Sequence, residues 1–183
     1  MTKILVVYNS RYGSTQKYAA SLSNSLDADL IPLAFLEPDE LKNYDTIVYG
    51  GGLYAGKLKG IKLLADNFKH LSHKNLVVFT CGLADPKNED NVKKIHTSLD
   101  KVFKPEMKEK ISCFHVRGGI NYKELTFGHK IMLVMFKKMV AKQTNLSEES
   151  KELLATDGQV VNYVDESTLQ PMLEHIKKLQ TTK

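Results

Sequence analysis

Apolar residues along this chain follow two alternating patterns, one typical of buried strands and one typical of helices. Residues 3–8, Lys-Ile-Leu-Val-Val-Tyr, form an apolar run with β-branched residues at its centre. Such a run is typical of a strand that is buried on both faces of a parallel sheet. Similar runs predict four further strands, at residues 28–34, 45–50, 75–81 and 111–116.

Helical spacing of apolar residues separates these predicted strands. Ile61, Leu64, Ala65 and Phe68, for example, recur at intervals of three and four residues. Parallel neighbours need connections long enough for a helix, so the pattern predicts a doubly wound α/β fold. We expect a three-layer sandwich, with a five-stranded parallel sheet and helices on both faces. The predicted helices are 15–26, 60–70, 89–103, 127–142 and 166–179.

One long connection departs from this regular alternation. The segment 117–165 is longer than a connection between the fifth strand and the last helix needs to be. Long connections in small domains are usually functional or mobile. With 183 residues, the chain is expected to form a single domain, residues 1–183, with an insertion at about 117–165 before the last helix.

Composition excludes several classes of protein. A hydrophobic fraction of 42% excludes a disordered chain, and two cysteines exclude a disulfide scaffold. No C-x-x-C pattern occurs, and His115 and His129 have no partner at metal-binding spacing, so we expect no metal site. The sequence shows neither a signal peptide nor an apolar stretch of the roughly 20 residues that span a membrane. We therefore expect a cytoplasmic protein.

The positive charge of the chain is concentrated in one segment. Residues 101–142 contain ten basic and three acidic side chains, a net charge of +7, against +5 for the whole chain. Such a patch indicates an anionic partner, namely a membrane surface, a nucleic acid or a carboxylate-bearing substrate. The alternative is an ordinary solvated surface rich in lysine.

The first candidate site directly follows the first predicted strand and opens the first helix. It consists of Ser10-Arg11-Tyr12-Gly13-Ser14-Thr15. The glycine permits a tight turn, while three hydroxyl groups and the N–H groups of the helix start point at one place, which suits a phosphate. The motifs of triphosphate loops and of dinucleotide-binding loops are both absent. The alternative is an ordinary capped helix, which needs one such hydroxyl rather than three.

Two further loops follow the third and fourth predicted strands. Ligands of open α/β sheets bind beyond the carboxyl ends of the strands, near the switch in strand order. The loop after the third strand contains Tyr54, which can stack on a planar ring. The alternative is that this glycine-rich segment is only a mobile loop with a surface tyrosine. The second offers backbone groups for the polar edge of the same ring. The two loops are Gly50-Gly51-Gly52-Leu53-Tyr54-Ala55-Gly56 and Thr80-Cys81-Gly82-Leu83-Ala84-Asp85.

Four other reactive side chains have simpler interpretations. Cys81 ends a buried strand and Cys113 lies inside one, and free cysteine in such places behaves mainly as a small hydrophobic residue. His115 and His129 lie near or within the insertion without partners at metal spacing. We therefore interpret them as surface or hydrogen-bonded histidines without a role in a site.

Taken together, the three loops resemble those of the flavodoxin family. The segment SRYGST resembles the family's T/S-x-T-G-x-T phosphate motif, with Ser10 in place of the first threonine. The resemblance covers roughly residues 1–116 and the last helix. It implies a flavodoxin-like sandwich that binds FMN without a covalent link. The implied cofactor-binding residues are Ser10, Arg11, Tyr12, Gly13, Ser14, Thr15, Gly51, Gly52, Leu53, Tyr54, Ala55, Gly56, Thr80, Cys81, Gly82, Leu83 and Ala84.

Within that family, the insertion and the late stretch DGQVVNYVD resemble the menaquinone-dependent protoporphyrinogen IX dehydrogenases of haem biosynthesis. This resemblance implies an FMN-dependent oxidoreductase whose carboxylated substrate suits Arg117, Lys123 and their neighbours. Its partners would be a small molecule or a quinone, and no nucleic acid. No side chain is assigned as an acid–base catalyst. The alternatives are a flavodoxin-type electron carrier, although such carriers are typically acidic, and a regulatory module that has lost flavin.

The predicted helix 127–142 has its own amphipathic pattern. At 100° per residue, Lys130, Lys137, Lys138 and Lys142 fall within one sector. Apolar residues fill much of the opposite side. Such a helix suits a peripheral position at the inner face of the cell membrane, or it simply packs on the domain with its lysines in water. The apolar residues are Met132, Leu133, Met135, Phe136, Met139 and Val140.

Overall fold

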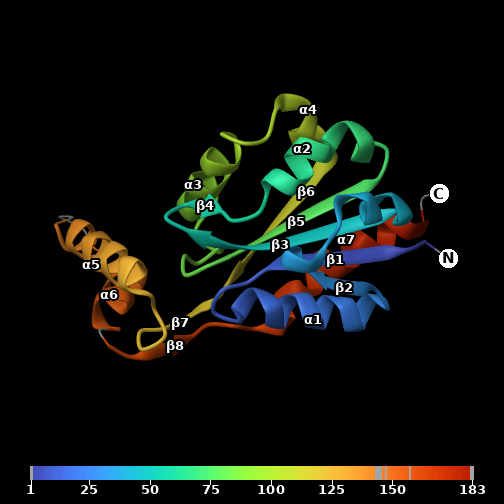
Figure 1. Cartoon of the computed structure of the whole chain (residues 1–183). Coiled ribbons are helices and arrows are strands. Elements are labelled where there is room, and N and C mark those ends of the chain that lie inside the picture. Colours follow the sequence, from blue (N-terminus) through green and yellow to red (C-terminus); the bar gives the residue numbers. More distant parts are fainter. Residues whose placement is uncertain (1, 143–145, 147, 157, 182–183) are drawn as a thin grey trace.

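A parallel sheet of five strands forms the centre of the molecule. The computed structural model describes residues 2–142, 146, 148–156 and 158–181. The strand order is β2-β1-β3-β5-β6, and all four pairings along it are parallel, which confirms the predicted sheet (Figure 1). The strands are β1 (Ile4–Asn9), β2 (Asp29–Pro32), β3 (Thr46–Tyr54), β5 (Asn75–Gly82) and β6 (Ile111–Arg117).

Helices cover both faces of this sheet, as expected for a doubly wound fold (Figure 1). Alternate residues of a strand point to opposite faces. Accordingly, Leu5 and Val7 belong to the core under α2 (Lys62–Leu71), α3 (Glu89–Leu99) and α4 (Pro105–Lys110). Ile4 and Val6 belong to the core under α1 (Ser14–Leu26) and α7 (Gln170–Thr181).

Gly50, Gly51 and Gly52 lie in the sheet, so the alternative interpretation of this segment as a mobile glycine loop does not hold for them. Gly50 and Gly51 are buried within β3, paired with Phe79 and Thr80 of β5. A Cβ on Gly50 would lie 2.1 Å from the ring of Phe79, so the glycine makes room for that ring. The end of β3 then pairs with the antiparallel strand β4 (Lys57–Leu58).

Between β6 and α7 the chain makes the excursion that the sequence predicted. It runs through β7 (Gly119–Asn121), α5 (Phe127–Ala141), α6 (Glu148–Ala155) and β8 (Val160–Asn162). β7 and β8 pair antiparallel and form its stem. In Figure 1, α5 and α6 lie beyond the carboxyl ends of the central strands, outside the three layers. We call residues 117–165 the insertion.

A buried tyrosine of α1 joins the two ends of the insertion. The hydroxyl of Tyr18 donates a hydrogen bond to the carbonyl oxygen of Arg117, at 2.7 Å. It also accepts one from the backbone N–H of Asp165, at 2.9 Å. Burial raises the pKa of Tyr18, so the phenol keeps its proton for the first of these bonds. The chain therefore leaves and re-enters the sandwich at one fixed place.

Short elements complete the chain, namely the 3₁₀ turns Leu33–Phe35, Pro38–Asn43 and Glu166–Leu169.

The distribution of lysines and apolar residues around α5 differs from the one expected from the sequence. Lys137 is buried, whereas Met135, Phe136 and Met139 are exposed, so the lysines and the apolar residues do not occupy separate faces. Within the described residues, no helix is both long and apolar enough to cross a membrane.

Candidate functional site

A cavity of about 110 Å³ opens where β1, β3 and β5 end. This is the side of the sheet where parallel α/β folds bind ligands, and the strand order reverses direction between β1 and β3. All three predicted loops reach the cavity, and so does the insertion. It is lined by Ser10, Tyr12, Ser14, Thr15, Gly52, Leu53, Tyr54, Cys81, Gly82, Leu83, Gly118, Gly119, Ile120, Leu125, His129, Met132 and Leu133.

The head of α1 supplies hydroxyl and N–H donors to this cavity. Gly13, with a φ of 89°, adopts the left-handed conformation that starts the helix, and its N–H donates to Ser10 Oγ at 3.1 Å. Ser14 Oγ accepts a hydrogen bond from the N–H of Gly119 at 3.0 Å, which leaves the hydroxyl proton of Ser14 for another acceptor. The first N–H groups of a helix have no partner within it. The arrangement therefore suits an anion.

Tyr54 folds back over the end of β3. A Cβ on Gly52 would lie 2.7 Å from the Tyr54 ring, so this position of the ring requires glycine at residue 52. The ring of Tyr12 meets the ring of Tyr54 edge-on, with 6.1 Å between their centroids. Burial raises the pKa of Tyr54, so the residue offers a neutral phenol next to the cavity.

The end of β5 is held by the insertion. The carbonyl oxygen of Gly82 accepts a hydrogen bond from the N–H of Gly118 at 2.6 Å. The carbonyl oxygen of Leu83 accepts one from Arg117 Nε at 2.9 Å. Burial raises the pKa of the Cys81 thiol to about 11, so Cys81 is protonated at neutral pH and packs as a small apolar residue.

His129, which the sequence analysis left outside any site, lies in the cavity. Its Nδ1 is 2.6 Å from the hydroxyl oxygen of Tyr12. Its ring stacks on the ring of Tyr54, with 5.1 Å between the centroids and 9° between the planes. The sequence carried no signal for these contacts, because the hairpin that brings the start of α5 to Tyr12 and Tyr54 contains strands of only three residues.

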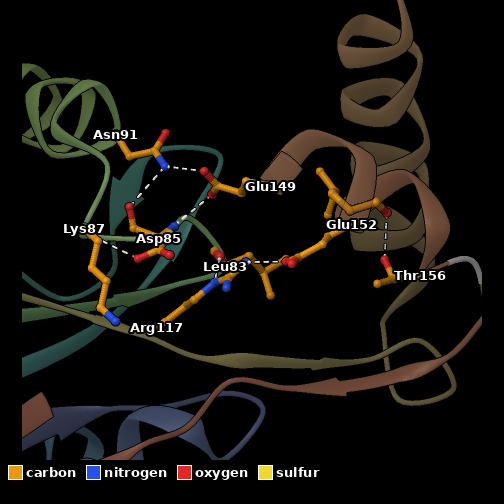
Figure 2. A network of polar contacts seen from close by, with 9 residues as sticks. Leu83, Asp85, Lys87, Asn91, Arg117, Glu149, Glu152 and Thr156 are labelled. Carbon is orange, nitrogen blue, oxygen red and sulfur yellow. Dashed lines mark hydrogen bonds and ion pairs between the residues drawn. The ribbon is translucent and has the colours of Figure 1, made fainter. Parts of the chain in front are cut away.

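The second helix of the insertion is fixed to the loop after β5. Figure 2 shows Glu149 of α6 reaching the N–H of Asp85 and the side-chain amide of Asn91, at 2.8 and 2.7 Å. Arg117 lies 3.5 Å from a carboxylate oxygen of Glu152 and also stacks over Tyr163. The sequence suggested that Arg117 attracts an anionic substrate, but in the structure its guanidinium contacts Leu83, Glu152 and Tyr163.

Several predicted site residues do not line the cavity. Thr80 is buried and lies 2.8 Å from His115 Nδ1, so its hydroxyl contacts that ring instead. Ala55 and Gly56 form the turn into β4, with φ values of 50° and 73°. Gly51 faces Leu58, on the other side of the strand. The predicted residues outside the cavity are Arg11, Gly13, Gly51, Ala55, Gly56, Thr80 and Ala84.

His115 belongs to a separate cluster on the α3 side of the sheet. Its Nε2 lies 3.3 Å from Nε2 of His96, and its pKa falls to about 4, mainly because burial disfavours the charged form and then because His96 is close. His115 is therefore a neutral, hydrogen-bonded histidine, as the sequence suggested. In the part of the chain that the structure describes, no three His, Cys, Asp or Glu side chains gather closely enough to hold a metal.

The fold and the cavity together define a class of protein. The sheet order, the donor-rich head of α1 and the neighbouring ends of β3 and β5 are those of a doubly wound α/β protein with a nucleotide-type site at its topological switch point. The chain belongs to the flavodoxin domain family, whose model matches residues 5–147. This membership supports FMN as the cofactor.

Individual known proteins resemble the chain more distantly. An uncharacterised protein of Methanocaldococcus jannaschii is 33% identical over 82 residues, which are 44% of this chain and 55% of that protein. The match thus spans about half the length of that relative. Oxidised flavodoxin 2 of Bacillus cereus is 23% identical, with a TM-score of 0.46, over 63% of this chain and 84% of its own. A flavoprotein of Lactobacillus acidophilus, solved in complex with FMN, is 17% identical, with a TM-score of 0.45, over 64% and 93% of the two chains.

The residues present fit such a cofactor. A phosphate needs donors and the absence of nearby carboxylates, and among the described residues that line the cavity none is acidic. A planar ring needs apolar and aromatic neighbours, which Leu53, Tyr54 and Leu83 supply.

Proposed function

We propose that this protein is an FMN-dependent oxidoreductase in which the insertion covers the cofactor site. The observation that carries this proposal is the position of His129, within hydrogen-bond reach of Tyr12 and stacked on Tyr54. An electron carrier works by exposing the edge of its cofactor to a protein partner. In this protein the insertion would cover the same edge of the cofactor, which favours a small substrate enclosed beside the flavin ring.

Each part of the site has a separate role in this proposal. The hydroxyl groups of Ser10, Ser14 and Thr15 and the N–H groups of the first turn of α1 bind the phosphate. Tyr54 packs against the ring, and the ends of β3 and β5 position its polar edge. Bound FMN supplies the redox chemistry, while the protein supplies orientation and the exclusion of water.

The specific reaction we propose follows the resemblance of the sequence. The substrate would be a porphyrinogen bearing carboxylates, such as protoporphyrinogen IX, which loses six electrons and six protons in becoming the porphyrin. Three quinones would accept them in turn, each taking up two electrons and two protons. The apolar and aromatic lining of the cavity supports a flat substrate, and the lysines of α5 support an anionic one. A plain electron carrier is the second candidate, supported by family membership alone.

We also propose that α5 rests on an anionic membrane surface, where a quinone would be found. Lys130, Lys138 and Lys142 are exposed on the same helix as several exposed apolar side chains, and α5 contains no acidic residue. Such a helix combines burial of apolar area with attraction to anionic headgroups. The exposed apolar residues are Phe127, Ile131, Val134, Met135, Phe136 and Met139.

One experiment separates the enzyme from the electron carrier. The purified protein would first be examined for the visible spectrum of bound FMN. It would then be mixed under anaerobic conditions with protoporphyrinogen IX and a soluble menaquinone analogue, and porphyrin formation followed by fluorescence. We expect turnover that requires both FMN and the quinone. Bound FMN that exchanges electrons only with a protein partner would instead make the chain an electron carrier.

A further inference from the structure

The cavity at the cofactor site contains one histidine that can exchange a proton with a ligand. Among the described residues that line this cavity, those with ionisable side chains are Tyr12, Tyr54, Cys81 and His129. Burial raises the pKa of Tyr54 and raises that of Cys81 to about 11, so both keep their protons at neutral pH. Tyrosine ordinarily ionises well above neutral pH, whereas histidine gains and loses a proton close to it. His129 is therefore the lining residue best suited to take up a proton.

The hydroxyl of Tyr12 holds one ring nitrogen of His129 and leaves the other available. The hydroxyl oxygen lies 2.6 Å from Nδ1 of His129, and it accepts a hydrogen bond from the N–H of Thr126 at 3.4 Å. A phenol oxygen can accept from two N–H groups, so we assign the proton of the neutral imidazole to Nδ1. Nε2 then carries a lone pair, and no group in the described part of the chain is hydrogen-bonded to it. This nitrogen can accept a proton from a ligand.

The charges around His129 leave the cavity without a carboxylate of its own. The positive groups of the surrounding elements are Arg11, Lys123 and Lys130. The carboxylates of the insertion on either side of α5 are bonded to other partners, and none of the following four lines the cavity. Glu124, Glu148, Glu149 and Glu152 contact Asn121, Lys151, Asn91 and Arg117, respectively. A proton on His129 is therefore stabilised chiefly by negative charge that a ligand brings into the cavity.

We propose that His129 is a catalytic residue that accepts the proton released by the substrate, and that Tyr12 is its positioning residue. This inference rests on the proposed function, in which bound FMN accepts the electrons. In each two-electron step, a C–H bond of a porphyrinogen methylene bridge breaks and its hydride passes to the flavin. A pyrrole N–H bond also breaks, its proton passes to Nε2 of His129, and a new double bond forms in the macrocycle. His129 is half-buried, so it can then release the proton to water.

The first test measures proton coupling at the cofactor without any substrate. The midpoint potential of bound FMN would be determined with redox dyes between about pH 5 and 8, where histidines titrate. Electrons on the cofactor add negative charge beside His129, which favours the protonated ring. Over part of this range, we expect the native protein to take up about one more proton per two electrons than His129→Gln. His70→Gln changes an exposed histidine on α2 and is the matched control, which should follow the native curve.

The second test follows the reduction of bound FMN by protoporphyrinogen IX under anaerobic conditions at several pH values. His129→Gln should slow this step by about a hundredfold to ten-thousandfold, and the decline of the native rate toward low pH should disappear. Added imidazole should restore part of the rate in His129→Ala. Tyr12→Phe leaves Nε2 in place but removes the hydroxyl that fixes the ring, so it should cause a smaller loss and a displaced pH profile.

The two tests separate this proposal from the function on which it rests. A potential with the same pH dependence in the native protein and in His129→Gln would overturn the proposal, and so would identical pH–rate profiles for the two. Since the first test needs only bound FMN, proton coupling through His129 without oxidation of the porphyrinogen would reject the proposed function alone. A protein that binds no FMN would reject both.

Discussion

Ser14 combines two tasks in one hydroxyl group. Its oxygen accepts a hydrogen bond from Gly119 and so ties the insertion to the head of α1, while its proton stays available for a phosphate. Thr15, the next residue, is buried at the same helix start. The Ser14 hydroxyl is thus one of the contacts that join the cofactor site to the insertion.

Replacing Ser14 and Thr15 together with alanine should lower FMN affinity by about a hundredfold or more. The change removes two hydrogen bonds to a charged group, each contributing roughly 1.5–3 kcal/mol. Titration of the apoprotein with FMN, followed by flavin fluorescence, measures the effect. Ser25→Ala, which removes an exposed hydroxyl at the far end of α1, is the control. Unchanged affinity in the double variant would place the phosphate elsewhere.

Because the pKa of the buried His115 is lowered, we expect the stability of the folded chain to depend on pH. Its pKa is about 4 in the folded chain and 6.5 in the unfolded chain, mainly because it is buried. Between these values the unfolded chain binds more protons, so stability should fall as the pH drops from 6.5 to 4. Allowing for partial exposure, we expect a loss on the order of 2 kcal/mol.

Thermal unfolding between pH 7 and pH 4.5 measures this loss. His115→Gln should flatten the decline, because the side chain that titrates is removed. The exposed His70 provides the matched control, and His70→Gln should follow the native curve. Parallel curves for native protein and His115→Gln would show that other groups cause the acid sensitivity.

The stem of the insertion depends on Tyr18 of α1. Tyr18→Phe keeps the ring in the core but leaves the carbonyl of Arg117 and the N–H of Asp165 without this partner. We expect a loss of about 1–3 kcal/mol, which for a chain of this size lowers Tm by roughly 2–4 °C per kcal/mol. Differential scanning calorimetry measures it. Tyr44→Phe removes a hydroxyl bonded to exposed Asp29 and should cost less. An equal effect of both changes would contradict a special role for Tyr18.

The elements that the sequence predicted correctly are those with long apolar runs or clear helical spacing. All five central strands and the helices at 127–142 and 89–103 fall in this group, since burial on one or two faces dictates the residues there. β7 and β8 have three residues each, too few to show a period. α6 is polar and has no buried residue, so its position depends on contacts such as Glu149 with Asp85.

In the candidate site, the residues near the ends of predicted strands could be predicted from the sequence, whereas those of the insertion could not. Ser10, Tyr12, Ser14, Thr15 and Leu83 follow strands closely, and Tyr54 is the last residue of β3. The carboxyl ends of parallel strands meet at one edge of a sheet, so these residues could be expected to lie together. His129 was missed because its place depends on the path of the insertion through space. The sequence also grouped Lys137 with the exposed lysines of the same helix, whereas the structure buries it. The spacing of residues along a helix shows which of them share a face, but it does not show which face packs against the rest of the protein.

The proposed contact with an anionic membrane can be tested on the exposed lysines at the end of α5. Lys138→Glu with Lys142→Glu should weaken binding to anionic vesicles by at least about thirtyfold at low salt, since each lysine contributes about 1 kcal/mol. Vesicle sedimentation measures the effect. The control, Lys69→Glu with Lys94→Glu, makes the same change of charge on α2 and α3. Equal loss in both pairs, or no binding by the native protein, would contradict docking through α5.

The meeting of the two ends of the insertion has an evolutionary consequence. The N–H of Tyr163 donates to the carbonyl of Gly118 at 3.2 Å, and Tyr18 contacts the chain just outside both residues. A segment with adjoining ends can be gained or lost in one genetic event without changing the register of any central strand. An ancestor with a short turn at this place would already have held the complete sheet and the head of α1. Acquisition of the insertion would then have added a cover to a flavin site that already existed.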